Sequence, residues 1–196
     1  MAHPAEPRAR RRPAAPPPRH GDRGTSGRGS PGAYQPRYLQ LVRVWRLCRR
    51  PYSAEPLWGK GGTLVAGRWH ERGSRIVYTS ATLSLAALEV LVHAGVDQVP
   101  PDLVAIEIEI PDGLKVAELP VAALPRDWRS IPAPRRLQQL GAKWLREKRS
   151  AVLRVPSAVI PSERNYLLNP LHEDAGRLAV VGVTAFEPDP RLLPRT

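Results

Sequence analysis

Hydrophobic and polar residues alternate in several short runs of this chain, a pattern that predicts β-strands because successive side chains point to opposite faces of a sheet. The clearest run is LVAIEIEI, where one valine and three isoleucines fall on one face and Glu107 and Glu109 on the other. The run AVLRVPSAVI is also strand-like but is interrupted by Pro156. Strands are predicted on this basis at 38–47, 75–80, 103–110, 115–119, 151–160 and 177–186.

The segment PRRLQQLGAKWLREKRS at 134–150 follows the helical period instead. Its apolar residues share one face and its basic residues lie elsewhere, which is typical of an amphipathic surface helix. The residues expected on the apolar face are Leu137, Leu140, Gly141, Trp144 and Leu145.

A second helix is predicted over ATLSLAALEVLVHAG, residues 81–95, with Thr79 or Ser80 as the candidate N-cap and Gly95 as the candidate terminator. This helix is apolar on nearly every side, as buried helices are, yet it carries Glu89 in its middle. Two principal helices with five or six strands predict a mixed α+β domain.

The formal net charge of +12 raises the question of a nucleic-acid partner. Residues 1–35 hold seven arginines against two acids, with many prolines and glycines and almost no large apolar side chains. Such a segment cannot bury enough apolar surface to offset its ordering entropy, so residues 1–36 are predicted to be a disordered Arg/Pro/Gly-rich arm. The remaining charge is spread along the predicted domain, 37–188, which weakens the nucleic-acid interpretation. Residues 189–196 are predicted to be a proline-punctuated C-terminal tail.

Cys48 is the only cysteine, which excludes an internal disulfide and a CxxC zinc pattern. No run of about 18 apolar residues is present, and the first 20 residues lack the apolar stretch of a secretory signal peptide. The expectation is a cytoplasmic protein with no membrane segment and no metal site.

Glu89 is the first candidate for chemistry, because burying an ionised carboxylate is costly unless the group is hydrogen-bonded or faces a cleft. From this segment alone, a helix-edge glutamate that reaches water is an equally good interpretation. His93 lies one turn further on the same face, where a packing or surface role is the simpler interpretation.

The stretch GKGGTLVAGRWHERGSRIVYTS at 59–80 contains five glycines, which indicates a loop that passes close to other backbone or to a ligand. It lacks the residue order of a Walker A loop. Arg68 could grip a phosphate through its planar guanidinium, and Trp69 and Tyr78 could stack on a flat ring. A surface arginine beside a core tryptophan and tyrosine is the alternative.

The stretch VPSAVIPSERNYLLNP at 155–170 places Ser157 between two prolines and brackets an apolar YLL with Asn165 and Asn169. Polar residues on rigid loops often form sites, although serine, asparagine and proline are also ordinary turn formers. No Gly-x-Ser-x-Gly elbow surrounds Ser157, so a hydrolase nucleophile is not expected.

Four stretches, VWRL, AGRWHERGSRIVYTS, LAALEVLVH and VPSAVIPSERNYLLNP, occur in this order and together resemble the RES domain family over about residues 40–188. The combination is specific, although no single stretch is. The resemblance implies an ADP-ribosyltransferase-like fold, with a mixed split β-sheet, flanking helices and NAD bound in a cleft. It also implies the toxin of a toxin–antitoxin system, which degrades NAD at the nicotinamide–ribose bond by phosphorolysis or hydrolysis.

The resemblance carries roles onto particular residues of this chain. His70 follows the tryptophan where the family often has asparagine, which puts the hydrogen bonding of that loop in question. The residues implied to be catalytic are Glu89, Arg46 and Ser157, and those implied to bind NAD are Arg46, Arg68, Tyr78, Ser157 and Asn169.

On the same resemblance, NAD is a substrate and not a resident cofactor, and inorganic phosphate is a candidate co-substrate. The implied partner is an Xre-type helix-turn-helix antitoxin, through which nucleic acid is reached only indirectly. Two other classes stay open: a protein ADP-ribosyltransferase with the same site, and a non-enzymatic nucleic-acid-binding protein that uses the basic arm.

Overall fold

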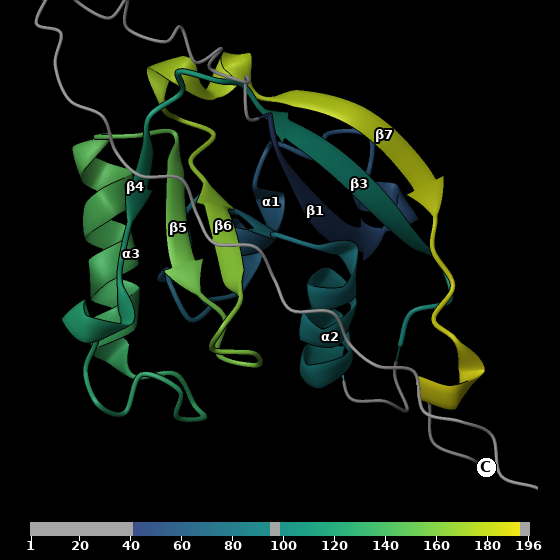
Figure 1. Ribbon diagram of the computed structural model, residues 1–196, viewed down its shortest axis with the longest axis horizontal. Coiled ribbons are helices and arrows are strands. Elements are labelled where there is room, and N and C mark those ends of the chain that lie inside the picture. The colour runs from purple at the N-terminus through teal and green to yellow at the C-terminus, as the bar shows by residue number, and fades with distance from the viewer. Residues whose placement is uncertain (1–40, 95–98, 193–196) are drawn as a thin grey trace, which may run out of the picture. The chain divides into compact units, whose positions relative to one another are not determined.

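The computed structural model describes residues 41–94 and 99–192 (Figure 1). The predicted disordered arm and the predicted helix terminator Gly95 lie outside these residues. Seven strands form one sheet in the order β4-β5-β6-β2-β1-β3-β7, with β4 and β5 parallel and all other neighbours antiparallel. The strands are β1 (Val42–Arg49), β2 (Val77–Ser80), β3 (Leu103–Ile110), β4 (Val116–Glu118), β5 (Val152–Pro156), β6 (Arg164–Leu168) and β7 (Ala179–Ala185).

The sheet is divided between β1 and β2. These two strands pair only at Trp45 and Ser80, whereas β1 and β3 pair along the whole of both strands. Two halves, β4-β5-β6-β2 and β1-β3-β7, are therefore joined by a single pair of residues. This arrangement confirms the mixed, split sheet of the predicted α+β class.

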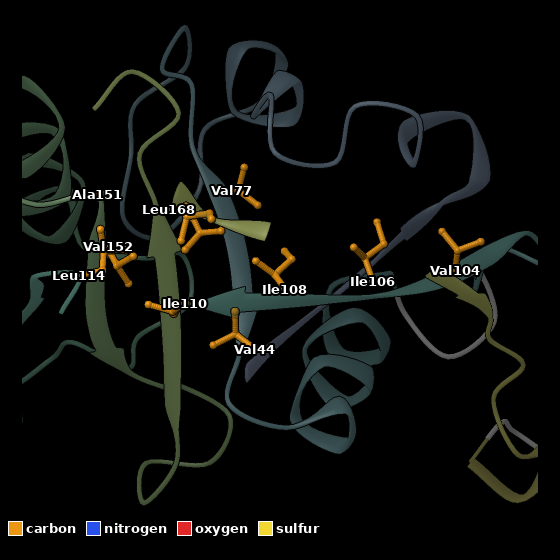
Figure 2. Close-up of a cluster of buried hydrophobic side chains, with 11 residues drawn as sticks. Val44, Val77, Val104, Ile106, Ile108, Ile110, Leu114, Ala151, Val152 and Leu168 are labelled. Atoms are coloured by element: carbon orange, nitrogen blue, oxygen red, sulfur yellow. The ribbon is translucent and has the colours of Figure 1, made fainter. Parts of the chain in front are cut away.

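Both halves of the sheet contribute to one buried apolar cluster (Figure 2). In β3 the predicted alternation is confirmed, because Ile106 and Ile108 are fully buried while the side chain of Glu107 keeps a fifth of its surface exposed. Val77 of β2 and Leu168 of β6 join the cluster from the other half. The hydrophobic effect thus holds together two halves that share little backbone pairing.

The helix α3 (Arg135–Glu147) packs through a second apolar cluster on β5 and β6. Its predicted apolar face is confirmed, with Leu137, Gly141 and Trp144 buried. At Gly141 the helix meets the backbone of Trp69 so closely that a Cβ would overlap the Trp69 carbonyl oxygen. A glycine is required here by close approach of the two backbones.

The helix α2 (Leu83–Ala94) packs against β1 and β2. Its N-cap is Thr82, whose Oγ1 accepts the Leu85 N–H at 3.1 Å, so the prediction of Thr79 or Ser80 is wrong. Those two residues end β2 instead, and their hydroxyls donate across to β6, at 2.8 Å in each case.

Two further elements differ from the prediction. RNYLL, which lies outside every predicted strand, is the strand β6, and it pairs with both β2 and β5. The glycine-rich stretch, also expected to be a loop, contains the short helix α1 (Lys60–Leu64). None of the helices in the described residues combines the length and the apolar character needed to cross a bilayer. Single 3₁₀ turns occupy Arg50–Tyr52, Val121–Ala123, Glu173–Arg177 and Pro190–Leu192.

Candidate active site

A cavity of about 620 Å³ opens where β1 leaves β2. Its walls come from β1, the glycine-rich segment, β2, α2 and the start of β6. The volume lies within the range of small-molecule sites, roughly 300–1,000 Å³. The residues that line it and are proposed from the sequence to contact a ligand are Arg46, Arg68, Trp69, Tyr78 and Glu89.

The face of α2 that lines this cavity carries Ala86, Glu89, Val90 and His93, residues that recur at helical spacing. Other positions of the same helix, including Leu85, are buried in the protein. One side of α2 thus packs into the protein core, and another side forms part of the cavity wall. This explains why α2 is apolar nearly all round and still carries a carboxylate.

The carboxylate of Glu89 is held by two side chains from the opposite half of the sheet. Its Oε1 accepts a hydrogen bond from Ser157 Oγ at 2.8 Å and another from Asn165 Nδ2 at 2.6 Å. Its Oε2 lies 3.8 Å from His93 Nε2, and the Glu89 side chain keeps 21% of its surface exposed. Hydrogen bonds to a partly buried carboxylate offset the loss of its hydration, which answers the question that the sequence raised.

Arg46 lies on β1 just past the single pairing point with β2. Its Nε is buried and has no hydrogen-bond partner in the described part of the chain. A buried donor without a partner is uncommon in folded proteins. Arg46 as a whole contributes to the cavity wall, where its positive charge suits an anionic ligand.

Arg68 reaches the same cavity from the glycine-rich segment. Its guanidinium is anchored, since Nη1 donates to the Trp128 carbonyl at 2.6 Å and both terminal nitrogens face the Ser130 carbonyl. Burial lowers the pKa of Arg68, and the negative charge of Glu89 opposes that shift. Arginine nevertheless stays protonated in proteins, so the cavity holds a fixed cation there.

Tyr78 is fixed by a short hydrogen-bonded chain. His70 Nε2 lies 2.9 Å from the Val65 carbonyl, which can only accept, so this nitrogen carries the proton and Nδ1 accepts from the Tyr78 hydroxyl at 2.8 Å. The Tyr78 oxygen in turn accepts the Trp69 N–H at 3.1 Å. Burial lowers the pKa of His70 and raises the pKa of Tyr78 well above its usual range, so both stay neutral at pH 7. The tyrosine hydroxyl is occupied, and its ring is the part that can meet a ligand.

Three sequence-based expectations need correction. Asn169 lies outside the cavity lining, and its amide donates to the Leu145 carbonyl and accepts the Leu171 N–H, which makes it a turn-forming residue. Ser157 is fully buried behind Glu89 and is not part of the lining. Trp69 belongs to the cavity lining, but it is only 2% exposed and its side chain packs in the core cluster under α3, so its ring is not free to stack on a ligand.

Asn165 is named in a candidate stretch of the sequence, but no role at the site was predicted for it. It lines the cavity and contacts Glu89 directly. The missing signal was the strand itself: once RNYLL is a strand, Asn165 becomes a polar residue inside a sheet, and a polar side chain there needs a partner. Ser80, which faces Asn165 across β2 and β6, was missed for the same reason.

Comparisons with known proteins agree on one family. A family model described as the RES domain matches residues 43–192. The Toxin Res of Pseudomonas putida is 41% identical over 151 residues, which cover 76% of this chain and 98% of that relative. The Prs ADP-ribosylating toxin of Sphingobium sp. is 38% identical over 154 residues, which cover 76% of this chain and 95% of that relative.

Among solved structures, one toxin chain is similar in fold. In the crystal structure of the M. tuberculosis MbcT–MbcA toxin–antitoxin complex, a chain superposes with a TM-score of 0.62 at 16% sequence identity. The match covers 76% of this chain and 85% of that chain. At this level of identity the similarity establishes a shared fold.

Proposed function

The chain belongs to the RES domain family of toxins, and from that premise we propose that it breaks NAD at the bond between nicotinamide and ribose. The ADP-ribosyl group would pass to water or to inorganic phosphate. The observation that carries the proposal is the Glu89 carboxylate, held at Oε1 by two donors in the wall of a cavity that also contains two arginines.

The chemistry of the bond explains the need for a fixed carboxylate. As the bond breaks, its electron pair goes to nicotinamide, which leaves as a neutral molecule, and positive charge develops on the ribose. A carboxylate beside the ribose stabilises that charge more than it stabilises the ground state, whose positive charge is on the nicotinamide ring. Water or phosphate then bonds to the ribose carbon. With water the products are nicotinamide, ADP-ribose and a proton released to the solvent.

The two arginines and the tyrosine fit the rest of NAD. The positive charges of Arg46 and of the anchored Arg68, both in the cavity lining, suit the two negative charges of the pyrophosphate. The ring of Tyr78, held by its occupied hydroxyl, is a surface on which the nicotinamide can stack. Ser157 acts through Glu89 in this proposal, and Asn169 is no longer proposed to bind NAD.

A protein ADP-ribosyltransferase is the second candidate function. The observation that favours it is the 38% identity to the Sphingobium protein named Prs ADP-ribosylating toxin. The same carboxylate would stabilise the same charge on the ribose, and only the acceptor would differ.

We also propose that the protein pairs with an antitoxin of the Xre type that covers the cavity, because an enzyme that consumes NAD without restraint would harm its own cell. Co-expression and copurification of the pair, with loss of NAD suppressed in the complex, is the expected result. A copurified complex with the full activity of the free toxin would contradict the cavity-covering role.

The decisive experiment is to incubate the purified chain with NAD labelled in its adenosine half and to identify the products. ADP-ribose alone indicates hydrolysis, ADP-ribose 1″-phosphate that forms only with added phosphate indicates phosphorolysis, and label on an added acceptor protein indicates transfer. We expect Glu89→Gln to lower the rate by about 10²–10³-fold.

Glu147→Gln on α3 is the matched control, because Glu147 is also a helical glutamate with a base four residues away but lies outside the cavity lining. It should keep the wild-type rate. Unchanged NAD consumption by Glu89→Gln would remove the basis of the proposed function.

A further inference from the structure

We infer that Asn165, anchored by Ser80, is a positioning residue that holds Glu89 Oε1 and thereby leaves Oε2 as the oxygen that faces the reacting sugar. The inference rests on the proposed function, since it assigns a role in the same reaction. It follows from counting donors and acceptors around the carboxylate and from the register of the sheet.

Ser157 has no hydrogen left for a substrate. Its Oγ accepts the N–H groups of Val159 at 3.1 Å and Ile160 at 3.0 Å, which use the two acceptor positions of the hydroxyl. Its single O–H therefore points to Glu89 Oε1. Ser157 is a fully buried support, fixed by main chain, on one side of the carboxylate.

Asn165 supplies the second support, and its orientation is determined by the carboxylate of Glu89. A carboxylate only accepts hydrogen bonds, so the amide nitrogen of Asn165 faces Glu89 Oε1 and its carbonyl oxygen faces Ser80 Oγ, which donates at 2.8 Å. Turning the amide over would set two oxygens against each other at 2.6 Å. Ser80, itself 4% exposed, anchors the other end of the amide by donating to its carbonyl oxygen.

The sheet places this pair where its two halves meet. Ser80 of β2 is paired in register with Asn165 of β6 on one side and with Trp45 of β1 on the other. Trp45 and Ser80 are the single residue pair that joins β1 to β2. The Asn165 support of Glu89 is thus part of the sheet, whereas Ser157 lies just beyond the end of β5.

Both donors meet Oε1, which leaves Oε2 directed elsewhere. The contact recorded for Oε2 in the described residues is His93 Nε2 at 3.8 Å, from a side chain that is 76% exposed. That is beyond hydrogen-bond distance. Oε2 is therefore the oxygen available to a ligand.

The first test is Asn165→Ala, measured on the full chain with NAD as the substrate. Loss of one support lets the carboxylate rotate, so kcat should fall by about 10–100-fold while KM changes little. Ser80→Ala should change kcat in the same direction by a smaller factor. Wild-type kcat in Asn165→Ala, in a protein where Glu89→Gln is inactive, would overturn the inference and leave the proposed function standing.

The matched control is Asn169→Ala. Asn169 is an asparagine four residues further along the chain, is 1% exposed, and bonds only to main chain outside the cavity. Its loss should lower the unfolding temperature but keep the kcat of the folded molecules. An equal fall of kcat in both variants would mean that any damage near β6 has this effect, and it would overturn the positioning role.

A second variant, Asn165→Asp, separates positioning from folding through its pH profile. At high pH two carboxylates at this distance repel, and activity should be lost; as the pH falls they share one proton, an O–H takes the place of the amide donor, and activity should recover. The wild type has every other charged or titratable group of the cavity lining, so a new loss of activity at high pH is due to the carboxylate that Asn165→Asp introduces. These groups are Arg46, Cys48, Arg49, Tyr52, Arg68, Tyr78 and His93. A pH profile parallel to that of the wild type would contradict the inference.

Discussion

The two long helices each carry an acid and a base four residues apart with the same separation. On α2, Glu89 and His93 lie 3.8 Å apart, and on α3, Lys143 and Glu147 also lie 3.8 Å apart. The two glutamate side chains are similarly exposed, 21% and 32%. Neither the spacing, the distance nor the exposure distinguishes them.

The difference lies in what approaches each carboxylate from the rest of the fold. Glu147 meets a second surface cation, Arg149, at 3.0 Å. Glu89 meets a buried hydroxyl and an amide from the far half of the sheet. Neutral hydrogen-bond donors that converge on one carboxylate, as at Glu89, indicate a site. Pairing of a carboxylate with surface cations, as at Glu147, is typical of a solvated helix face.

The largest effect on stability is expected from the core face of α3. Leu137→Ala removes a fully buried side chain and should lower the free energy of unfolding by about 2–5 kcal/mol. NAD turnover per folded molecule should stay at the wild-type value, because Leu137 is not in the cavity lining. Denaturant unfolding and turnover at a temperature where the variant is folded measure the two quantities. A turnover as low as that of Glu89→Gln would contradict the view that α3 has a packing role only, while α2 carries the site.

Gly141→Ala sharpens the comparison, since it is the point where α3 touches the site. The added methyl would overlap the Trp69 carbonyl, so the backbone must shift, at a cost of about 1–3 kcal/mol in stability. Arg68 directly precedes Trp69 in the chain, so the shift should also reduce turnover. Gly176→Ala is the control, because a Cβ there meets no atom within 4 Å. If a destabilised Gly141→Ala protein kept full turnover, α3 would contribute to the stability of the fold and not to the geometry of the site.

The smallest effect is expected from Glu147→Gln. Breaking an exposed pair at this spacing should lower the free energy of unfolding by at most about 0.5 kcal/mol. The difference from the wild type should shrink further in high salt, because salt screens exposed charges. Urea unfolding at low and high salt measures it. A loss that exceeds the effect of Gly141→Ala would mean that the surface pair on α3 is more than a solvated contact.

Local features of the fold could be predicted from the sequence, because they depend on nearby residues. The strand at 103–110 has its predicted bounds, and the apolar face of α3 has its predicted residues, since burial acts directly on alternation and helical period. Glu89 could be singled out because a carboxylate in an apolar helix conflicts with its surroundings. The N-cap of α2 could not be predicted, because Thr79, Ser80 and Thr82 are all suitable residue types. Only the contacts with β6 show that the hydroxyls of Thr79 and Ser80 are already used and that Thr82 is left to cap the helix.

Features that depend on distant parts of the chain could not be predicted. Asn165 and Ser157 reach Glu89 across 76 and 68 residues of sequence. The strand β6 exists because β2 and β5 lie on either side of it, and its five residues between turn formers give a weak local signal. Asn169 shares the residue type and the flanking pattern of a site residue, and only its partners show that it shapes a turn.

The single pairing of Trp45 with Ser80 has a consequence for how this protein responds to mutation. From Arg46 to Arg49, β1 keeps its partner β3 on one edge while the edge toward β2 has no paired strand in the described residues. Peptide N–H and C=O groups along that edge point into the opening, where a ligand can satisfy them. Alanine scanning leaves such groups in place, so it would undercount the affinity that they provide, and replacement by proline or by a backbone ester would be needed to reveal it.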